Sequence, residues 1–137
     1  MPTAGAARPF ENSAGLVKEH PAGYVLLVYK PGPRTLADLQ ALITRIGHLL
    51  QRNGWHRILG DQRLMTPLPP EQRAWLVAYW DAYTQQHPGR VYAAVLHAQD
   101  VFARLAVSQL RQDIGSTNLA YRSFADEASA SAWLARH

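Results

Sequence analysis

The 137-residue sequence contains no cysteine. Disulfide bonds, thiolate metal sites and cysteine nucleophiles are therefore excluded. Its six histidines do not fall at a spacing that would place two of them on one helical face to bind a metal. No apolar run reaches the roughly 18 residues that a membrane helix needs. The sequence therefore predicts a protein without a metal, another cofactor or an integral membrane segment.

The opening segment, MPTAGAARPF, lacks the apolar stretch of a signal peptide and is typical of a flexible tail over residues 1–10. The remaining length fits one domain, which we place at residues 11–137. A hydrophobic content of 47% is enough to form a core that needs no disulfide bonds or other covalent cross-links. The missing leader and the missing cysteines together favour a cytoplasmic location.

Charge of one sign does not gather anywhere in the sequence. Fourteen Lys and Arg residues stand against ten Asp and Glu residues, and the formal net charge is +4. Acidic residues interrupt the basic ones throughout, whereas a nucleic-acid binder usually gathers its positive charge on one stripe. We therefore expect no nucleic-acid partner.

Catalytic motifs are missing as well. The glycines in PGPR and GDQR lack the spacing of a phosphate-binding loop. Ser108 stands inside a predicted helix and has no nucleophile-elbow motif around it. The sequence favours a non-enzymatic protein, and an enzyme that uses Asp61, Arg63 and His97 is the weaker alternative.

Two apolar runs near the start, AGLVKEH and YVLLVYK, are separated by PAG. Their Val, Leu and Tyr content favours strands, and Pro21 and Gly23 favour a tight turn between them. The pattern predicts an antiparallel hairpin. PGPR then ends the second strand, because proline cannot donate a hydrogen bond to a sheet.

A helix follows over residues 35–54. Thr35 suits its N-cap, Asp38 suits the positive end of the helix dipole, and Gly54 suits its end. Its apolar residues recur at steps of three and four and define one buried face: Leu36, Leu39, Ile43, Ile46 and Leu50.

Strands and helices alternate over the rest of the chain. We predict strands at 55–60, 91–97 and 118–124, and helices at 69–86, 100–112 and 126–137. Pro70 fits the first turn of the helix at 69–86. In the helix at 100–112, Phe102, Leu105 and Leu110 are expected to face the core, with Asp100 at the start as a cap. In the last helix, capped by Asp126, the residues expected to face the core are Ala128, Ala132 and Trp133.

This order predicts an α/β fold with one mixed sheet. The N-terminal hairpin is antiparallel, the later strands are mainly parallel, and about four helices cover the sheet. The carboxyl ends of parallel strands meet at one edge, where ligands tend to bind. Residues 60–68 and His97 are therefore expected at the same edge.

The C-terminal segment FADEASASAWL, together with the order of elements over residues 12–135, resembles the small bacterial SpoIIAA-like proteins of the STAS superfamily. The resemblance implies a non-catalytic regulatory module that binds a protein partner or itself. In the best-known members, a Ser or Thr in the loop after the central strand is phosphorylated. That loop corresponds to residues 60–68 here.

The loop departs from the family pattern, because Gln62 and Arg63 follow Asp61 where a hydroxyl is expected. Thr66 is the nearest substitute. Asp61, Gln62, Arg63, Thr66 and His97 are thus candidates for a phosphoswitch or for the edge of a ligand site. The alternative function is a small-molecule or lipid-binding domain that uses this edge near Asp61 and His97.

A final candidate is the aromatic band of the helix at 69–86. Large aromatic residues occupy more of its circumference than one buried face needs. Trp80 and Tyr83 are therefore candidates for an exposed interface, since interfaces favour Trp and Tyr. Packing in the core is the other interpretation of the same residues.

Overall fold

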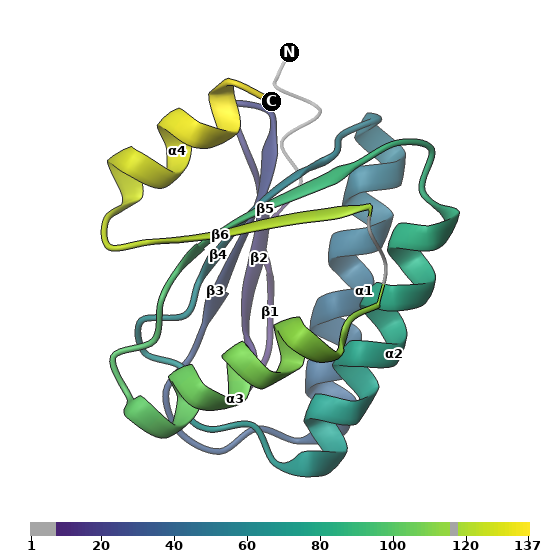
Figure 1. Cartoon of the computed structure of the whole chain (residues 1–137). Coiled ribbons are helices and arrows are strands. Elements are labelled where there is room, and N and C mark those ends of the chain that lie inside the picture. Colours follow the sequence, from purple (N-terminus) through teal and green to yellow (C-terminus); the bar gives the residue numbers. More distant parts are fainter. Residues whose placement is uncertain (1–7, 116–117) are drawn as a thin grey trace.

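The computed structural model describes residues 8–115 and 118–137 and has the predicted α/β architecture (Figure 1). Six strands form one sheet in the order in which they occur in the chain. They are β1 (Phe10–Glu11), β2 (Gly15–His20), β3 (Tyr24–Tyr29), β4 (Arg57–Asp61), β5 (Val91–Leu96) and β6 (Leu119–Phe124). The helices are α1 (Leu36–Asn53), α2 (Pro70–Gln86), α3 (Val101–Asp113) and α4 (Glu127–Ala135).

The sheet is mixed in the predicted way. β1 to β3 pair antiparallel, and β3 to β6 pair parallel. The hairpin turn is confirmed, because the Gly23 N–H donates to the His20 carbonyl at 3.0 Å. Gly23 has a φ of 88°, a conformation that favours glycine. The short strand β1 was not predicted and includes Phe10, the last residue assigned to the tail. Residues 1–7 of that predicted tail lie outside the described residues.

Two hydrophobic cores lie on opposite faces of the sheet. The larger core fills the space between the sheet and helices α1, α2 and α3, while α4 is the only helix of the described residues that covers the other face (Figure 1). The predicted caps position these helices. Thr35, Asp100 and Asp126 each accept a hydrogen bond from a backbone N–H three residues later, and Gly54 ends α1 in the left-handed conformation.

Two of the three residues of α3 that were predicted to face the core do not face it. Phe102 and Leu105 are 72% and 62% exposed, whereas Leu110 is buried. Ala103 and Val107 join Leu110 on the buried side. The spacing of the apolar residues along α3 is compatible with burial of either side of the helix. The cap at Asp100 and a hydrogen bond from the Gln99 N–H to the Arg63 carbonyl fix where the helix begins, and therefore its rotation.

The predicted inward face of α4 is also wrong in part. Ala128 and Ala132 are exposed, while Trp133 is buried as expected, beside Ala130 and Leu134. A helix as short as α4 contacts the sheet with few residues. Trp133 and Leu134 contribute the large apolar area, and their position turns the two other alanines toward solvent.

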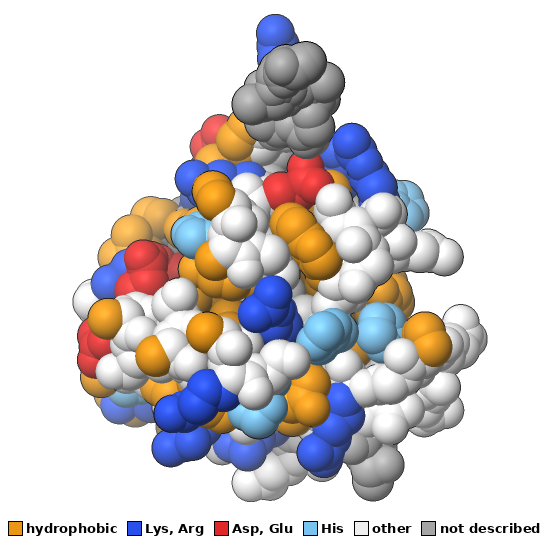
Figure 2. Space-filling model, turned by 90° about the horizontal axis from the view of Figure 1, so that it is seen from above, with side chains coloured by type: hydrophobic (Ala, Val, Ile, Leu, Met, Phe, Trp, Pro, Cys, Tyr) orange, Lys and Arg blue, Asp and Glu red, His pale blue; other side chains and the backbone are white. Residues whose placement is uncertain are grey.

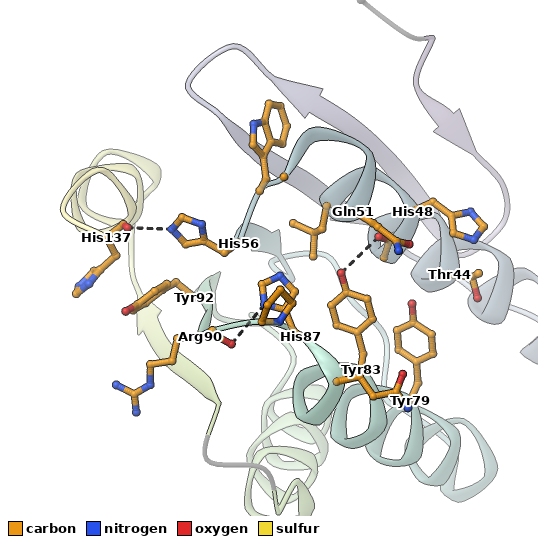
Figure 3. A pocket seen from close by; sticks show the side chains of 17 residues that line it. Thr44, His48, Gln51, His56, Tyr79, Tyr83, His87, Arg90, Tyr92 and His137 are labelled. Carbon is orange, nitrogen blue, oxygen red and sulfur yellow. Dashed lines mark hydrogen bonds between the residues drawn. The ribbon is translucent and has the colours of Figure 1, made fainter.

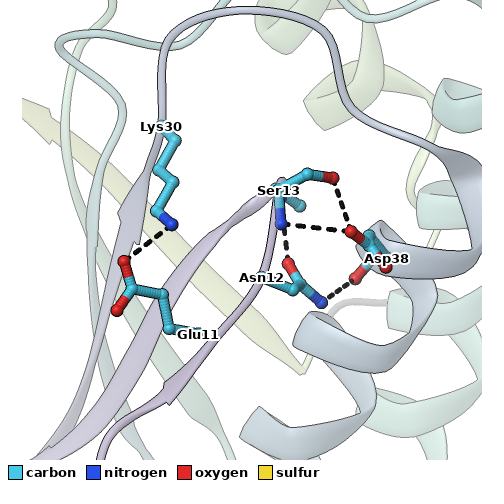
Figure 4. A network of polar contacts seen from close by, with 6 residues as sticks. Glu11, Asn12, Ser13, Lys30 and Asp38 are labelled. Atoms are coloured by element: carbon cyan, nitrogen blue, oxygen red, sulfur yellow. Dashed lines mark hydrogen bonds and ion pairs between the residues drawn. The ribbon is translucent and has the colours of Figure 1, made fainter.

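A polar network ties the connection between β1 and β2 to the start of α1 (Figure 4). An Asp38 carboxylate oxygen accepts hydrogen bonds from the Ser13 backbone N–H and hydroxyl. The Asn12 side-chain amide donates to the Asp38 carbonyl at 2.9 Å. Lys30 and Glu11 form an ion pair of 2.6 Å nearby. The side-chain and backbone hydrogen bonds from Ser13 lower the pKa of Asp38.

Removing this carboxylate should change the pH dependence of stability. A depressed carboxyl pKa stabilises the fold above the unfolded-state pKa of about 3.9, and this stabilisation is lost as pH falls through the lower folded-state pKa. Asp38→Asn should therefore lower the melting temperature near pH 7, and the difference from wild type should shrink toward about pH 3. Thermal melts by circular dichroism would measure this. A difference that stays constant with pH would contradict the role of the charge.

Candidate functional site

The two loops at the carboxyl edge of the parallel strands lie side by side, as predicted. The Gln62 N–H donates to the Leu96 carbonyl at 3.0 Å, and the Gln99 N–H donates to the Arg63 carbonyl at 3.2 Å. These bonds extend the β4–β5 pairing beyond the ends of both strands. Residues 61–63 and His97 therefore share one edge, because parallel neighbours end on the same side of a sheet.

Asp61 and Arg63 bind each other at this edge. Asp61 accepts hydrogen bonds from the Arg63 backbone N–H at 3.1 Å, from Nε at 3.0 Å and from Nη2 at 2.8 Å. Burial acts to raise the pKa of Asp61, but the hydrogen bonds and the charge of Arg63 outweigh it and the pKa is lowered. This geometry favours a structural turn, with the carboxylate already occupied.

Thr66 also takes part in a structural contact. Its hydroxyl donates to the Gly32 carbonyl at 3.0 Å and accepts from Arg34 Nη2 at 2.8 Å. Arg34 further donates to the carbonyls of Thr66 and Pro67 and to the Gln72 side chain. The threonine thus helps to join the loop before α1 to the loop before α2. Phosphorylation of Thr66 remains a prediction, and it would remove the hydrogen bond that the hydroxyl donates to the Gly32 carbonyl, because a phosphate ester oxygen carries no proton.

Gln62 and His97, the other two predicted edge residues, line a shallow pocket of about 260 Å³ between α3 and the ends of β5 and β6. Arginines, hydroxyl groups and one imidazole surround this pocket, which we call the edge pocket. Its full lining comprises Gln62, His97, Ala98, Arg104, Val107, Ser108, Arg111, Tyr121 and Ser123. The lining contains no carboxylate side chain.

An inner cavity of about 70 Å³ adjoins the edge pocket and shares Gln62, Arg111 and Tyr121 with it. Most of the remaining lining is apolar, with Gly60 and Ala93 on the sheet side and Leu110 on the helix side, and Tyr29 and Trp80 add aromatic rings that carry one polar group each. Arg111 lies over the Tyr121 ring, with its Cζ 4.8 Å from the ring centre. Burial raises the pKa of Tyr121 to about 12, so its hydroxyl is neutral at ordinary pH.

Four large apolar side chains are exposed at the same edge of the sheet. Leu64, Val101, Phe102 and Leu105 are between 57% and 72% exposed. Leu64 follows the Arg63 carbonyl that bonds to Gln99, and the other three occupy the outer side of the first turns of α3. We call these four residues the α3 patch. The patch was not predicted from the sequence, because Phe102 and Leu105 were expected in the core.

A cavity larger than these two lies at the opposite, amino edge of the parallel strands, and no pattern in the sequence predicted it. It has a volume of about 890 Å³ and is bounded by the last turns of α1 and α2, the starts of β4 and β5, and His137. Figure 2 shows this end of the molecule, where several histidine side chains gather. In Figure 3, four histidines and three tyrosines surround the cavity: His48, His56, His87, His137, Tyr79, Tyr83 and Tyr92.

Ring packing and hydrogen bonds hold many of these side chains. Tyr83 stacks on Tyr79, and its hydroxyl donates to the Gly47 carbonyl at 3.4 Å. His56 Nε2 lies 3.0 Å from the His137 carbonyl, and the His137 ring stacks on Tyr92. Across residues 8–115 and 118–137, no three His, Cys, Asp or Glu side chains are placed to hold a metal ion. This histidine cluster therefore lacks the geometry of a metal centre.

Trp80 and Tyr83, predicted as interface candidates, are half-buried and pack against the larger core. Trp80 lines the inner cavity, and Tyr83 lines the cavity at the amino edge. Neither belongs to the α3 patch. Their role at an interface remains a prediction, and the most exposed apolar side chains are on the next helix instead.

Comparison with models of protein families, with curated proteins and with solved structures gave no match to this chain. Among the described residues, no helix has both the length and the apolar content needed to span a bilayer.

Proposed function

We propose that this chain is a non-catalytic, cytoplasmic regulatory module of the SpoIIAA-like type, and that it acts by binding a partner protein through the α3 patch. The observation that carries this proposal is the location of the patch. Every exposed large apolar side chain among the described residues lies in the two adjoining segments that hold Leu64 and residues 101–105. Grouped apolar exposure of this kind marks interaction sites, whereas single exposed apolar residues need no explanation.

The surroundings of the patch indicate the chemistry of the partner. Arg104 stands between Phe102 and Leu105 in the sequence and is exposed. Its Nε donates to the Ala98 carbonyl, which holds the guanidinium close to the patch. Arg63, one residue before Leu64, is exposed too, but Asp61 pairs with its charge. A partner surface that offers apolar side chains and an acidic group opposite Arg104 is complementary to this arrangement.

The proposal is therefore supported by the exposed apolar surface at the α3 patch. No arrangement of catalytic groups contributes to it. Asp61 and Arg63 are occupied by each other and His97 is exposed, so the residues of the enzyme alternative do not converge on one reacting position. The alternative function, binding of a small ligand, concerns the edge pocket. It is a separate hypothesis, because the residues that line this pocket differ from the four residues of the patch.

Phe102→Ala should weaken binding of the partner by at least about tenfold, because a central aromatic anchor typically contributes 2 kcal/mol or more to an interface. The same change should alter the free energy of unfolding by less than about 0.5 kcal/mol, since the side chain is largely exposed. Incorporating a photo-crosslinking phenylalanine analogue at position 102 in the native host would capture the partner. Binding of the purified partner to both forms then gives the affinity change.

The matched control carries the same photo-crosslinker at Ala128, an exposed position of α4 on the other face of the sheet. Crosslinks specific to position 102 that disappear in a Leu105→Ser background would support the proposal. Equal crosslinking from positions 102 and 128, or an unchanged affinity for Phe102→Ala, would rule it out. A crosslink to a second copy of the chain would identify the partner as the protein itself.

A further inference from the structure

The edge pocket and the inner cavity beneath it form a two-part space that is distinct from the α3 patch. Helix α3 has three sides. Ala103, Val107 and Leu110 are buried, and the patch residues lie on the outer side. Arg104, Ser108 and Arg111 follow one another at steps of four and three, so they share the third side. That side borders the edge pocket.

The outer part of this space is suited to an anion. His97, Arg104 and Arg111 line it, and no Asp or Glu does. The ion pairs Lys30–Glu11 and Arg63–Asp61 involve neither pocket arginine, and Arg104 and Arg111 have no carboxylate partner among the described residues. Arg104 uses Nε to bind the Ala98 carbonyl, which leaves its two Nη groups for a ligand. Planar guanidinium groups bind carboxylates through two parallel hydrogen bonds.

The inner part of this space is suited to a small apolar group. Its volume of about 70 Å³ corresponds to about two water-sized units. The cavity persists because Gly60 and Ala93 place little or no side chain on the sheet floor, and an added Cβ on Gly60 would meet only Val95 Cγ2, at 3.8 Å. A cavity with largely apolar walls favours apolar occupants over water. Tyr121 and Gln62 lie at the junction of the two parts, where the Tyr121 hydroxyl is hydrogen-bonded to the side chains of Gln62 and Ser123.

We infer that this space is a binding site for a small carboxylate with a short branched alkyl group, whose carboxylate contacts Arg104 in the edge pocket and whose alkyl group enters the inner cavity. The inference does not rest on the proposed protein interaction, because the pocket and the four patch residues lie on different sides of α3, although Arg104 borders both. Most small-molecule sites combine such an apolar recess with a few converging polar groups.

Isothermal titration calorimetry with three probes tests both halves of the site. The probes are 3-methylbutanoate, acetate, which has only a methyl group in place of the branched alkyl group, and 3-methylbutanamide, which lacks the charge. We expect 3-methylbutanoate to bind at least about tenfold more tightly than either analogue, since each buried methylene favours transfer from water. Amide shifts in nuclear magnetic resonance spectra should locate the bound probe at His97, Ser108 and Ser123.

Three variants assign the contacts. Arg104→Gln should reduce the affinity for 3-methylbutanoate at least about tenfold by removing a charge-assisted contact, whereas Arg52→Gln, a surface arginine of α1 outside the pocket, should not change it. Gly60→Val should reduce the affinity for 3-methylbutanoate but not for acetate, because it fills the inner cavity.

No binding of 3-methylbutanoate to the wild type, or equal binding to Arg104→Gln, would overturn the inference. Phe102→Ala should leave this affinity unchanged, which separates the test from that of the proposed interaction.

Discussion

Gly15→Ala is expected to destabilise the fold by about 3 kcal/mol, at the upper end of the range for overpacking. Gly15 is buried in β2 opposite Tyr29 of β3. An added Cβ would overlap the Val28 backbone carbonyl oxygen and would lie 3.2 Å from both the Leu42 side chain and the Tyr29 Cα. A backbone oxygen cannot rotate away as a side chain can, so the hairpin itself would have to shift.

Urea unfolding followed by circular dichroism would measure this loss. In the absence of a clash, alanine in place of glycine normally stabilises a protein by about 0.4–1 kcal/mol through the unfolded chain. Gly60→Ala is the matched control, because Gly60 is also buried in a strand but an added Cβ would make only an ordinary contact with Val95. Equal stabilities for the two variants would show that β2 and β3 do not approach as closely as described.

Trp133→Ala is expected to cost about 3–5 kcal/mol of unfolding free energy, the usual range for deleting a large buried aromatic side chain. Trp133 is buried between α4 and the sheet, and its ring packs against Tyr92 and Phe124 at centre distances of 6.0 and 5.8 Å. It is the largest side chain of the smaller core. Since α4 alone covers this face within the described residues, no other helix there can fill the space.

The same unfolding measurement checks this prediction, with Ala132→Ser as the control. Ala132 precedes Trp133 in the same helix but is exposed, so its substitution should change the free energy of unfolding by less than about 0.5 kcal/mol. A loss below about 1 kcal/mol for Trp133→Ala would mean that α4 does not seal this face. Ordinary surface substitutions have effects of that smaller size.

These two experiments examine different parts of the molecule. Gly15 tests the antiparallel hairpin and the larger core, and Trp133 tests the smaller core. The sites proposed above are built on neither residue. Loss of stability in these variants therefore bears on the fold, while Phe102→Ala and Arg104→Gln bear on function.

Much of the fold is determined locally and could be read from the sequence. Thr35, Asp100 and Asp126 cap helices because a side-chain oxygen needs only the backbone N–H groups three residues later. Alternating strands and helices imply parallel pairing, and parallel pairing places residues 61–63 beside His97. The meeting of the two loops at one edge is thus a consequence of the sequence pattern.

The roles of the candidate residues at that edge needed the structure. Asp61, Arg63 and Thr66 have side chains that could take part in a functional site. In the structure, their hydrogen bonds join Asp61 to Arg63 and Thr66 to the Gly32 carbonyl. His97 and Gln62 keep contact with a pocket because they border the gap between α3 and the sheet. Residue type alone cannot show whether a polar group is already satisfied by a neighbour.

The sequence by itself thus determined the fold class, the caps, the hairpin and the edge at which the strand-end loops meet, because all of these depend on neighbours in the chain or on strand order. Only the tertiary structure decided which side of α3 is buried and that Gly60 and Ala93 leave a cavity. It also decided that histidines as distant as His48 and His137 surround one concavity. These features depend on how packed elements rotate and approach one another, and periodic spacing of apolar residues does not fix that rotation.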